Sequence, residues 1–234
     1  MGAMPAPVFF LPGLLEDADA FEAQISALVG HAPCSAADLT ANDSIAALAA
    51  EALKQAPARR LSLVGHSMGG YVALEILRQA PERVERLALL NTHARPDSPE
   101  STENRRRLMA LAQKDFPAVI EALIDKIVLP AHREDVDLIG VITGMGLGTG
   151  VEAFIRQEKA VIARIDSRPH LAQIRCPTLV VAAREDGIMP VPWLEELANG
   201  IPGARFEIVE ESGHMASLEQ PDRVSELLVE WLGR

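Results

Sequence analysis

One serine lies in a setting that would make its hydroxyl reactive. The segment Gly65-His66-Ser67-Met68-Gly69 directly follows the apolar run Leu61–Val64 and precedes a stretch with helical periodicity. A Gly-x-Ser-x-Gly pattern between a strand and a helix is typical of a sharp turn that exposes a nucleophilic serine. Side chains on either side would clash in such a turn, so glycine is needed there. We predict Ser67 as a nucleophile; a glycine-rich packing turn is the plainer alternative.

A serine nucleophile needs a base, because a hydroxyl is weakly nucleophilic near neutral pH. Among the six histidines, His214 has the most suitable position, after a predicted strand and just before the last predicted helix. His66 belongs to the turn itself, and its side chain should point away from the attack site. His93 follows a strand and could line the pocket. We therefore predict His214 as the base, rather than an ordinary surface or core histidine.

The base in turn needs an acid that fixes its tautomer and stabilises its charged form. Asp186 lies directly beyond the apolar run Thr178–Ala183, between Ser67 and His214 in the chain. This gives the order serine, aspartate, histidine that accompanies the Gly-x-Ser-x-Gly turn. We predict Asp186 as the acid, with the adjacent Glu185 as the alternative.

Acyl transfer also requires hydrogen-bond donors for the oxyanion. The backbone N–H of Met68, directly after the nucleophile, is one expected donor. The second is expected from Leu11-Pro12-Gly13-Leu14-Leu15, which follows the first predicted strand. Proline has no N–H, so we predict Leu14; an ordinary strand-ending turn would also explain the Pro-Gly pair.

Strand-length apolar runs alternate with helical segments on both sides of a wholly helical stretch. The runs Val8–Leu11, Leu61–Val64, Val84–Leu90, Thr178–Ala183 and Phe206–Val209, with a short one near Cys34, predict an α/β fold. We expect a mostly parallel sheet of about six strands flanked by helices. Residues 1–94 and 168–234 would form this core, and residues 95–167 a helical cap over the carboxyl ends of the strands, where such sheets bind ligands.

The cap is expected to contribute apolar side chains to the pocket. The candidates, each of which could equally be a core residue, are Met109, Phe116, Ile142, Met145 and Phe154, together with Met189 outside the cap. The Gly144–Gly150 run is interpreted as a flexible cap turn, with a hinge as the alternative. Arg105-Arg106-Arg107 is interpreted as a solvated helix face.

Composition excludes several classes of partner. The net charge of −11 argues against nucleic acid, because phosphate repels an acidic protein. The apolar stretch near the amino terminus is too short for a signal peptide core or a membrane span, so we expect a cytoplasmic protein without a membrane partner. Cys34 and Cys176 are interpreted as small core residues, with a disulfide or a reactive thiol as the alternative, and their spacing suggests no metal site. The sequence is compatible with either a monomer or a homo-oligomer.

Gly-His-Ser-Met-Gly-Gly and the ending Ser-Gly-His-Met…Gln220-Pro221 resemble the α/β-hydrolase superfamily. The likeness is to its small capped branch, which includes esterases, enol-lactonases, cofactor-free haloperoxidases and carbon–carbon bond hydrolases. It implies a Ser67–Asp186–His214 triad, a Leu14/Met68 oxyanion hole, a helical lid and no cofactor. Pro12 stands where many relatives have histidine, and Tyr71 where the similar menaquinone-pathway synthases have arginine, which disfavours that activity.

We therefore expect a serine hydrolase that acts on a small-molecule substrate. The substrate would be a small or medium carboxylic ester, lactone or thioester, cleaved through an acyl-enzyme on Ser67. A serine nucleophile disfavours the epoxide hydrolase and haloalkane dehalogenase chemistry of aspartate-bearing relatives. Carbon–carbon bond hydrolysis, lyase chemistry with the same triad, or a non-enzymatic small-molecule receptor on this fold remain the alternatives.

Overall fold

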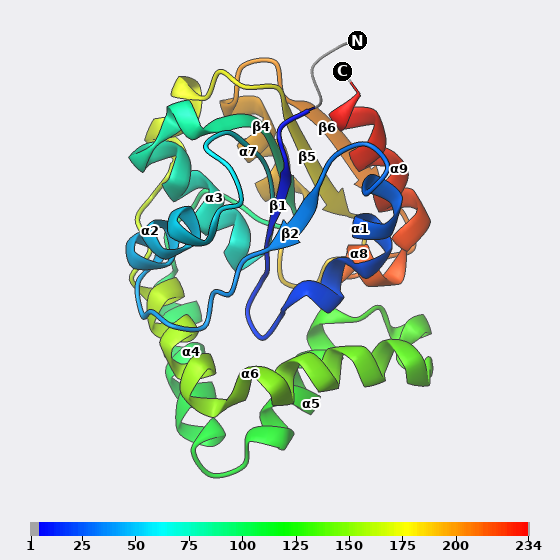
Figure 1. Ribbon diagram of the computed structural model, residues 1–234. Helices are drawn as coiled ribbons and strands as arrows, with labels where there is room; N and C mark the ends of the chain where they lie inside the picture. Colours follow the sequence, from blue (N-terminus) through cyan, green and yellow to red (C-terminus); the bar gives the residue numbers. More distant parts are fainter. Residues whose placement is uncertain (1–4, 234) are drawn as a thin grey trace.

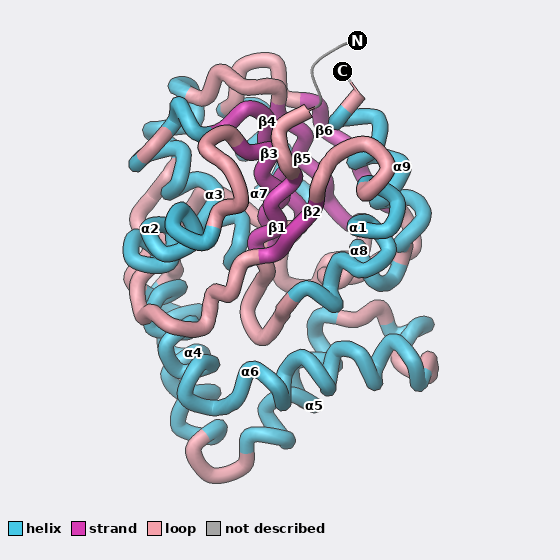
Figure 2. Tube along the Cα trace, viewed as in Figure 1, coloured by secondary structure: helices cyan, strands magenta, loops and turns pink. Residues whose placement is uncertain are grey.

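A six-stranded, wholly parallel sheet forms the centre of the computed structural model, which describes residues 5–233 (Figure 2). Its order is β2-β1-β3-β4-β5-β6. The bounds are β1 Val8–Leu11, β2 Cys34–Ala36, β3 Leu61–His66, β4 Val84–Leu90, β5 Thr178–Ala183 and β6 Arg205–Val209. The α/β class expected from the sequence is confirmed. Residues 1–4 and 234 of the predicted core range lie outside the described residues.

Helices cover both faces of the sheet, which explains why β1, β3 and β5 are buried along their whole length (Figure 1). One face packs against α2 (Ile45–Gln55), α3 (Met68–Gln79) and α7 (Val191–Gly200). The other packs against α1 (Glu22–Leu28) and α9 (Pro221–Leu232). The short elements are α8 (Ala216–Glu219) and the 3-10 turns Ala18–Phe21, Pro81–Arg83, Pro130–His132 and Arg168–Gln173.

Local chemistry accounts for where several helices begin. The Ser44 hydroxyl accepts a hydrogen bond from Ala47 N–H at 3.2 Å and caps α2, as its position in the sequence suggests. The 3-10 turn Ala18–Phe21 precedes α1, and the Asp17 side chain caps this turn by accepting a hydrogen bond from Asp19 N–H at 2.9 Å. The last helix starts at Pro221, earlier than its apolar periodicity indicates, because proline fits the first helical turn, where no backbone N–H is needed.

The segment between β4 and β5 is entirely helical. It contains α4 (Pro99–Ala112), α5 (Phe116–Ile127) and α6 (Val136–Ile162), which pack against one another. Figure 1 places these three helices together at the end of the molecule toward which the strands point, opposite the two termini. The helical insertion therefore lies over the carboxyl ends of the strands, where the predicted site residues are found.

The interpretation of the Gly144–Gly150 run as a turn is wrong. The run is part of α6, and only Gly150 leaves the helical conformation, with φ 79° and ψ 163°. Six of its seven residues therefore extend the helix, and the glycines at 144 and 148 face open space.

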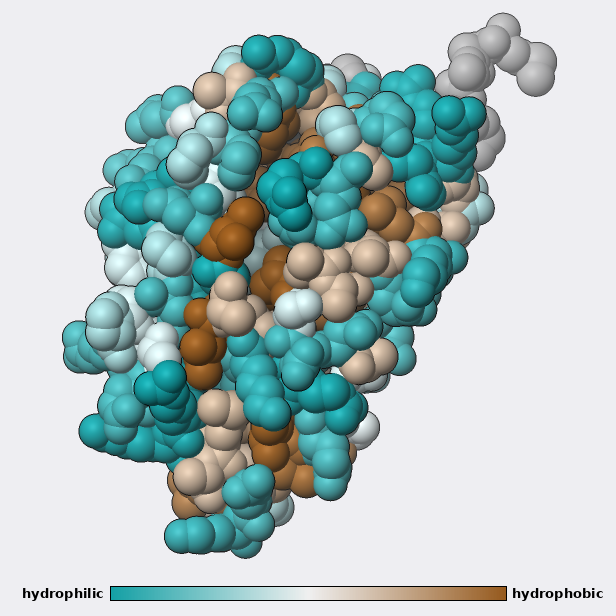
Figure 3. Space-filling view, turned by 90° about the vertical axis from the view of Figure 1, so that its left-hand side faces the viewer, coloured by the Kyte–Doolittle hydropathy of each residue, from teal (hydrophilic) through white to brown (hydrophobic). Residues whose placement is uncertain are grey.

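The surface of this region carries some apolar side chains. By length and apolar composition, α6 is the one described helix that could cross a membrane, although its inner side packs against α4 and α5. Val136 and Leu147 on its outer side are 80% and 52% exposed. On the face shown in Figure 3, apolar patches are scattered among hydrophilic residues.

Candidate active site

Ser67 occupies a strained turn between β3 and α3. Its backbone has φ 50° and ψ −116°, a left-handed conformation that non-glycine residues rarely adopt. A Cβ at Gly65 would lie 2.6 Å from the carbonyl oxygen of Gly69, and a Cβ at Gly69 would overlap the carbonyl oxygen of Leu11. The backbone N–H of Ser67 donates to Leu90 O at 3.0 Å. The hydrogen bond to β4 thus holds the turn in place. Positions 65 and 69, two residues before and after the serine, admit only glycine.

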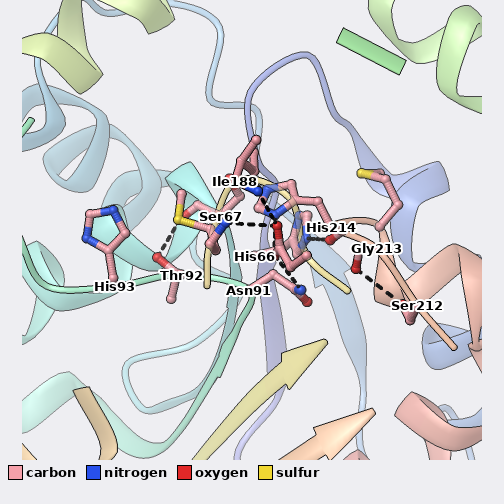
Figure 4. Close-up of polar contacts among 12 residues, drawn as sticks. His66, Ser67, Asn91, Thr92, His93, Ile188, Ser212, Gly213 and His214 are labelled. Atoms are coloured by element: carbon pink, nitrogen blue, oxygen red, sulfur yellow. Dashed lines mark hydrogen bonds and ion pairs between the residues drawn. The ribbon is translucent and has the colours of Figure 1, made fainter. Parts of the chain in front are cut away.

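Ser67, His214 and Asp186 form one hydrogen-bonded line. Ser67 Oγ lies 2.9 Å from His214 Nε2, and His214 Nδ1 lies 2.7 Å from Asp186 Oδ2. Ser67 follows β3, Asp186 lies in the loop after β5, and His214 lies in the loop after β6. Each of the three residues is less than a tenth exposed. Figure 4 shows Ser67 and His214 facing each other, with His93 off to one side. The structure thus brings together the three residues selected from the sequence.

Four hydrogen bonds hold Asp186 in place. Besides His214, it accepts from Asn91 Nδ2, Ile188 N–H and Met189 N–H, each at 2.9 Å. Burial alone would raise the pKa of Asp186, but His214 and these donors lower it below its usual value. Sequence reasoning missed Asn91, although a polar residue directly after the buried strand β4 was an available signal.

The runner-up acid, Glu185, points elsewhere. Its side chain is exposed and accepts a hydrogen bond from Ser212 N–H at 3.0 Å. It therefore binds Ser212 without contacting the imidazole, and only Asp186 of the adjacent pair can orient the ring.

The loop after β1 leaves one N–H free beside Ser67. Gly13 N–H donates to Glu16 at 2.8 Å, and Leu15 N–H donates to Gln157 at 3.1 Å. Within the described residues, Leu14 N–H has no hydrogen-bond partner, and Leu14 lines the same cavity as Ser67 and Met68. Met68 is the first residue of α3, so its N–H lacks an intrahelical acceptor. Both predicted oxyanion donors therefore lack an intramolecular acceptor within the described residues, and both residues line this cavity.

The cavity has a volume of about 390 Å³ and lies between the sheet and the inserted helices. Ile142, Met145 and Met189 line it, as expected. The other three residues predicted to line it, Met109, Phe116 and Phe154, do not. The rings of Phe116 and Phe154 pack on each other, with centroids 5.7 Å apart, because both sides of α6 must be covered in this small insertion.

One end of the cavity is polar and charged. Arg105 on α4 pairs with Glu158 on α6 at 2.7 Å, and Arg164 pairs with Asp97 at 2.9 Å. Burial raises the pKa of the Glu158 carboxyl, although Arg105 acts in the opposite direction. The interpretation of Arg105 as part of a solvated face is wrong, since its side chain is only 22% exposed and turns inward to these carboxylates.

A chain of hydrogen bonds at this end fixes the proton positions. Arg95 N–H donates to His93 Nδ1 at 3.0 Å, so the His93 proton is on Nε2, 3.3 Å from Tyr71 Oη. Burial, and then the charge of Arg164, lower the pKa of His93 to about 3. Tyr71 Oη therefore accepts from a neutral His93, and its own proton remains available to a ligand. Both residues line the cavity, which sequence analysis considered for His93 alone.

The two cysteines are free and only partly buried. Cys176 packs at the edge of the core on the side of α2, α3 and α7, and Cys34 at the edge of the core on the opposite face. Burial raises the pKa of both thiols, which makes them less reactive than an exposed cysteine.

Comparisons with known proteins find a family model and several proteins that are similar to this chain. A family model described as the alpha/beta hydrolase family matches residues 8–227. RutD from Azorhizobium caulinodans, provisionally named a carbamate hydrolase, is 28% identical over 180 residues, 73% of this chain. A 2-hydroxy-6-oxononadienedioate/2-hydroxy-6-oxononatrienedioate hydrolase from Paraburkholderia phymatum is 28% identical over 181 residues, 75% of this chain. The chain spans 65% and 63% of these two relatives, less than two-thirds of each.

A solved structure is similar over nearly the whole chain. It is that of a thermophilic esterase from Thermogutta terrifontis with malate bound, at a TM-score of 0.89 and 29% identity. The similarity covers 98% of this chain and 90% of the esterase.

Proposed function

This chain belongs to the alpha/beta hydrolase family, and on that premise we propose that it is a serine hydrolase. Its substrate would be a small or medium carboxylic ester, lactone or thioester, cleaved through an acyl-enzyme on Ser67. The observation that carries the proposal is the line Ser67–His214–Asp186, with its 2.9 Å and 2.7 Å hydrogen bonds beside a cavity. The esterase named above supports this class of reaction.

The proposed reaction has two stages. Ser67 Oγ transfers its proton to His214 Nε2 and attacks the substrate carbonyl carbon, while Asp186 stabilises the imidazolium. The N–H groups of Met68 and Leu14 hold the oxyanion. His214 then gives its proton to the leaving alcohol or thiol. Water, deprotonated by His214, attacks the acyl-enzyme, releases the carboxylic acid and restores Ser67.

The two ends of the cavity suggest how a substrate would lie. Apolar side chains such as Ile120, Ile124 and Met145 suit an acyl or alkyl group. At the other end, Tyr71 offers a free O–H, and Arg105 lies nearby. We infer that the substrate combines an apolar portion with an oxygen-bearing one.

Carbon–carbon bond hydrolysis is the second candidate. The polar end of the cavity favours it, because the oxygen atoms of a diketone-type substrate would find donors in Tyr71 and Arg105. The relative from Paraburkholderia phymatum is named as a hydrolase of an oxo-dienedioate, an oxygen-rich substrate of this kind. In this reaction the same triad would cleave a bond to carbon instead of oxygen.

The acidic net charge of −11 supports a small-molecule substrate and no nucleic acid. We propose that the enzyme acts in the cytoplasm without a membrane partner, and that it could form a homo-oligomer.

A fluorophosphonate probe tests the proposal directly, because it labels only an activated serine. We expect labelling of the wild type and none of Ser67→Ala. A panel of p-nitrophenyl esters, lactones, thioesters and a vinylogous diketone would then identify the bond cleaved. Absence of labelling at neutral and mildly alkaline pH would contradict the proposed hydrolase and favour a small-molecule receptor on this fold.

A further inference from the structure

A buried carboxylate outside the triad holds both sides of the His214 backbone. Glu219 Oε1 accepts from Gly213 N–H at 3.0 Å and from Met215 N–H at 3.2 Å, the two residues adjacent to His214. Its other oxygen accepts from Leu129 N–H at 2.8 Å and lies 3.0 Å from His132 Nδ1. The Glu219 side chain is fully buried. One carboxylate therefore joins the loop of the base to the segment after α5.

The insertion contacts the same loop through its backbone. His214 N–H donates to Ile127 O, the last residue of α5, at 2.7 Å. A Cβ at Gly213 would lie 2.7 Å from the same carbonyl oxygen and 2.9 Å from Leu129 N. Three consecutive N–H groups, from Gly213 to Met215, are thus fixed by Glu219 and Ile127, which leaves this loop little freedom to shift.

A second buried carboxylate reaches the His214 carbonyl through His66. His66 Nε2 lies 2.9 Å from His214 O, so this nitrogen must donate, because a carbonyl oxygen only accepts. His66 Nδ1 lies 2.8 Å from Glu16 Oε2, which also accepts from Gly13 N–H at 2.8 Å. Burial alone would lower the pKa of His66, but the charge of Glu16, its hydrogen bond and the His214 carbonyl raise it above the usual value. Glu16 and His66 therefore join the base to the loop of Leu14.

We propose that Glu219 and Glu16 are positioning residues that set the His214 imidazole against Ser67. Each ties the His214 backbone to another part of the site: Glu219 to the inserted helices, and Glu16, through His66, to the oxyanion loop. Neither carboxylate contacts the reacting atoms of the triad. The inference rests on the proposed hydrolase function, since only a reaction that uses His214 as base would depend on this placement.

Two carboxylates would serve this role because the distance between the His214 imidazole and Ser67 tolerates little change. Proton transfer from Ser67 needs the imidazole within hydrogen-bond reach, and a displacement of about 1 Å can cost about a hundredfold in rate. The four groups around Glu219 are three backbone donors and one imidazole nitrogen. A neutral amide in its place would present an NH₂ group either to Gly213 and Met215 or to Leu129 and His132, so the join between the His214 loop and the segment after α5 would be disturbed on one side.

The test compares Glu219→Gln and Glu16→Gln with the wild type. For p-nitrophenyl acetate we expect kcat to fall about 10- to 100-fold in Glu219→Gln and about tenfold in Glu16→Gln, because the amide oxygen at 16 keeps one bond. KM should stay within about twofold in Glu219→Gln, because the Glu219 side chain does not line the cavity. In proton NMR, the low-field resonance of the His214–Asp186 hydrogen bond should shift in both variants.

Glu185→Gln is the matched control. This exposed carboxylate binds Ser212 N–H on the same loop, without contacting Gly213 or Met215, so kcat and the low-field resonance should remain as in the wild type. Folded Glu219→Gln and Glu16→Gln with wild-type kcat and resonance would overturn the proposal. If one variant does not fold, the other decides; loss of folding in both would assign the pair a purely structural role and also overturn it.

The readouts separate this proposal from the hydrolase function itself. If the wild type neither hydrolyses esters nor reacts with the fluorophosphonate, the proposed function fails. The NMR resonance still reports whether the two carboxylates place His214, because it requires no turnover.

Discussion

Two adjacent carboxylates, Glu185 and Asp186, have different surroundings although both follow β5. Asp186 is buried against His214 and receives three further hydrogen bonds, whereas Glu185 is exposed and binds one backbone N–H. The lowered pKa of Asp186 keeps it ionised at neutral pH, where it can stabilise an imidazolium. At the scale of single residues, the turn after the strand decides which of the two faces the base.

Asp186→Asn should therefore reduce kcat by about 10³- to 10⁴-fold, because an amide favours the wrong imidazole tautomer. Glu185→Gln should remain near the wild type. Steady-state kinetics with a p-nitrophenyl ester measure both. A larger loss in Glu185→Gln than in Asp186→Asn would show that the geometry around His214 has been misassigned.

His93 should make the protein sensitive to acid. Its pKa of about 3 lies below the usual 6.5 of histidine, so between these values the unfolded chain binds a proton that the folded chain does not. Stability then rises with pH, by up to about 1.4 kcal/mol per pH unit, and falls as the pH drops below about 6.

His93→Gln removes this titration and should flatten the dependence. Urea unfolding at a series of pH values from neutral to about pH 4 would measure it. His66, whose pKa is raised and whose contribution has the opposite sign, is present in both proteins, so the difference isolates His93. His31→Gln, at an exposed histidine, is the control and should keep the wild-type slope. An unchanged slope in His93→Gln would contradict this prediction.

At the scale of elements, α6 owes its shape to two kinds of glycine. Gly150 has φ 79° and kinks the helix, whereas Gly144 is helical, and a Cβ added there would have no atom within 4 Å. The first position needs glycine for its backbone conformation. The second has no such need, and a glycine there costs helix stability relative to alanine.

Alanine should therefore have opposite effects at the two sites. Gly144→Ala should raise the free energy of unfolding by about 0.5–1 kcal/mol, because it restricts the unfolded chain and fits the helix. Gly150→Ala should lower it by about 1–3 kcal/mol, because alanine is strained at this φ. Urea unfolding monitored by circular dichroism gives both values. Equal effects would mean that the kink at Gly150 does not persist in solution.

The elements could be predicted well because their signals are local. The apolar runs Val84–Leu90 and Thr178–Ala183 have the bounds in the structure that the sequence predicts. The prediction of a turn at Gly144–Gly150 fails because the number of glycines in a segment does not show whether their φ angles are helical. The prediction for Arg105 fails because its buried side depends on Glu158, 53 residues away.

At the scale of the whole molecule, the contacts that unite the site span most of the chain. The triad could be predicted because each member follows a strand, and parallel strands end at one edge of the sheet. The bonds from Glu219 to Leu129 and from Glu16 to His66 cross 90 and 50 residues, and no pattern in the sequence marks them. They follow only from how the insertion and the first loop pack.

Both ends of the helical insertion meet the core at one cluster of buried charges. Asp97, where the insertion begins, accepts from Arg164, where it ends, at 2.9 Å, and from Arg105 at 3.3 Å. Ser167 N–H also donates to Ala94 O at 2.8 Å. The side chains of Asp97 and Arg164 are 2% and 6% exposed, so the Asp97 carboxylate is the nearby negative charge that compensates Arg164, and it shares Arg105 with Glu158.

Asp97→Asn should destabilise the protein because it leaves two buried guanidinium groups with less negative charge. Removing one partner of a buried ion pair costs about 3–5 kcal/mol, so the urea midpoint should fall clearly. Asp166→Asn is the matched control, because Asp166 forms an exposed ion pair with Arg168. Solvent screens that pair, so the urea midpoint should remain unchanged. If both variants unfold at the same urea concentration, the charge cluster does not fasten the insertion to the core, and apolar packing of α4–α6 over the sheet must hold it instead.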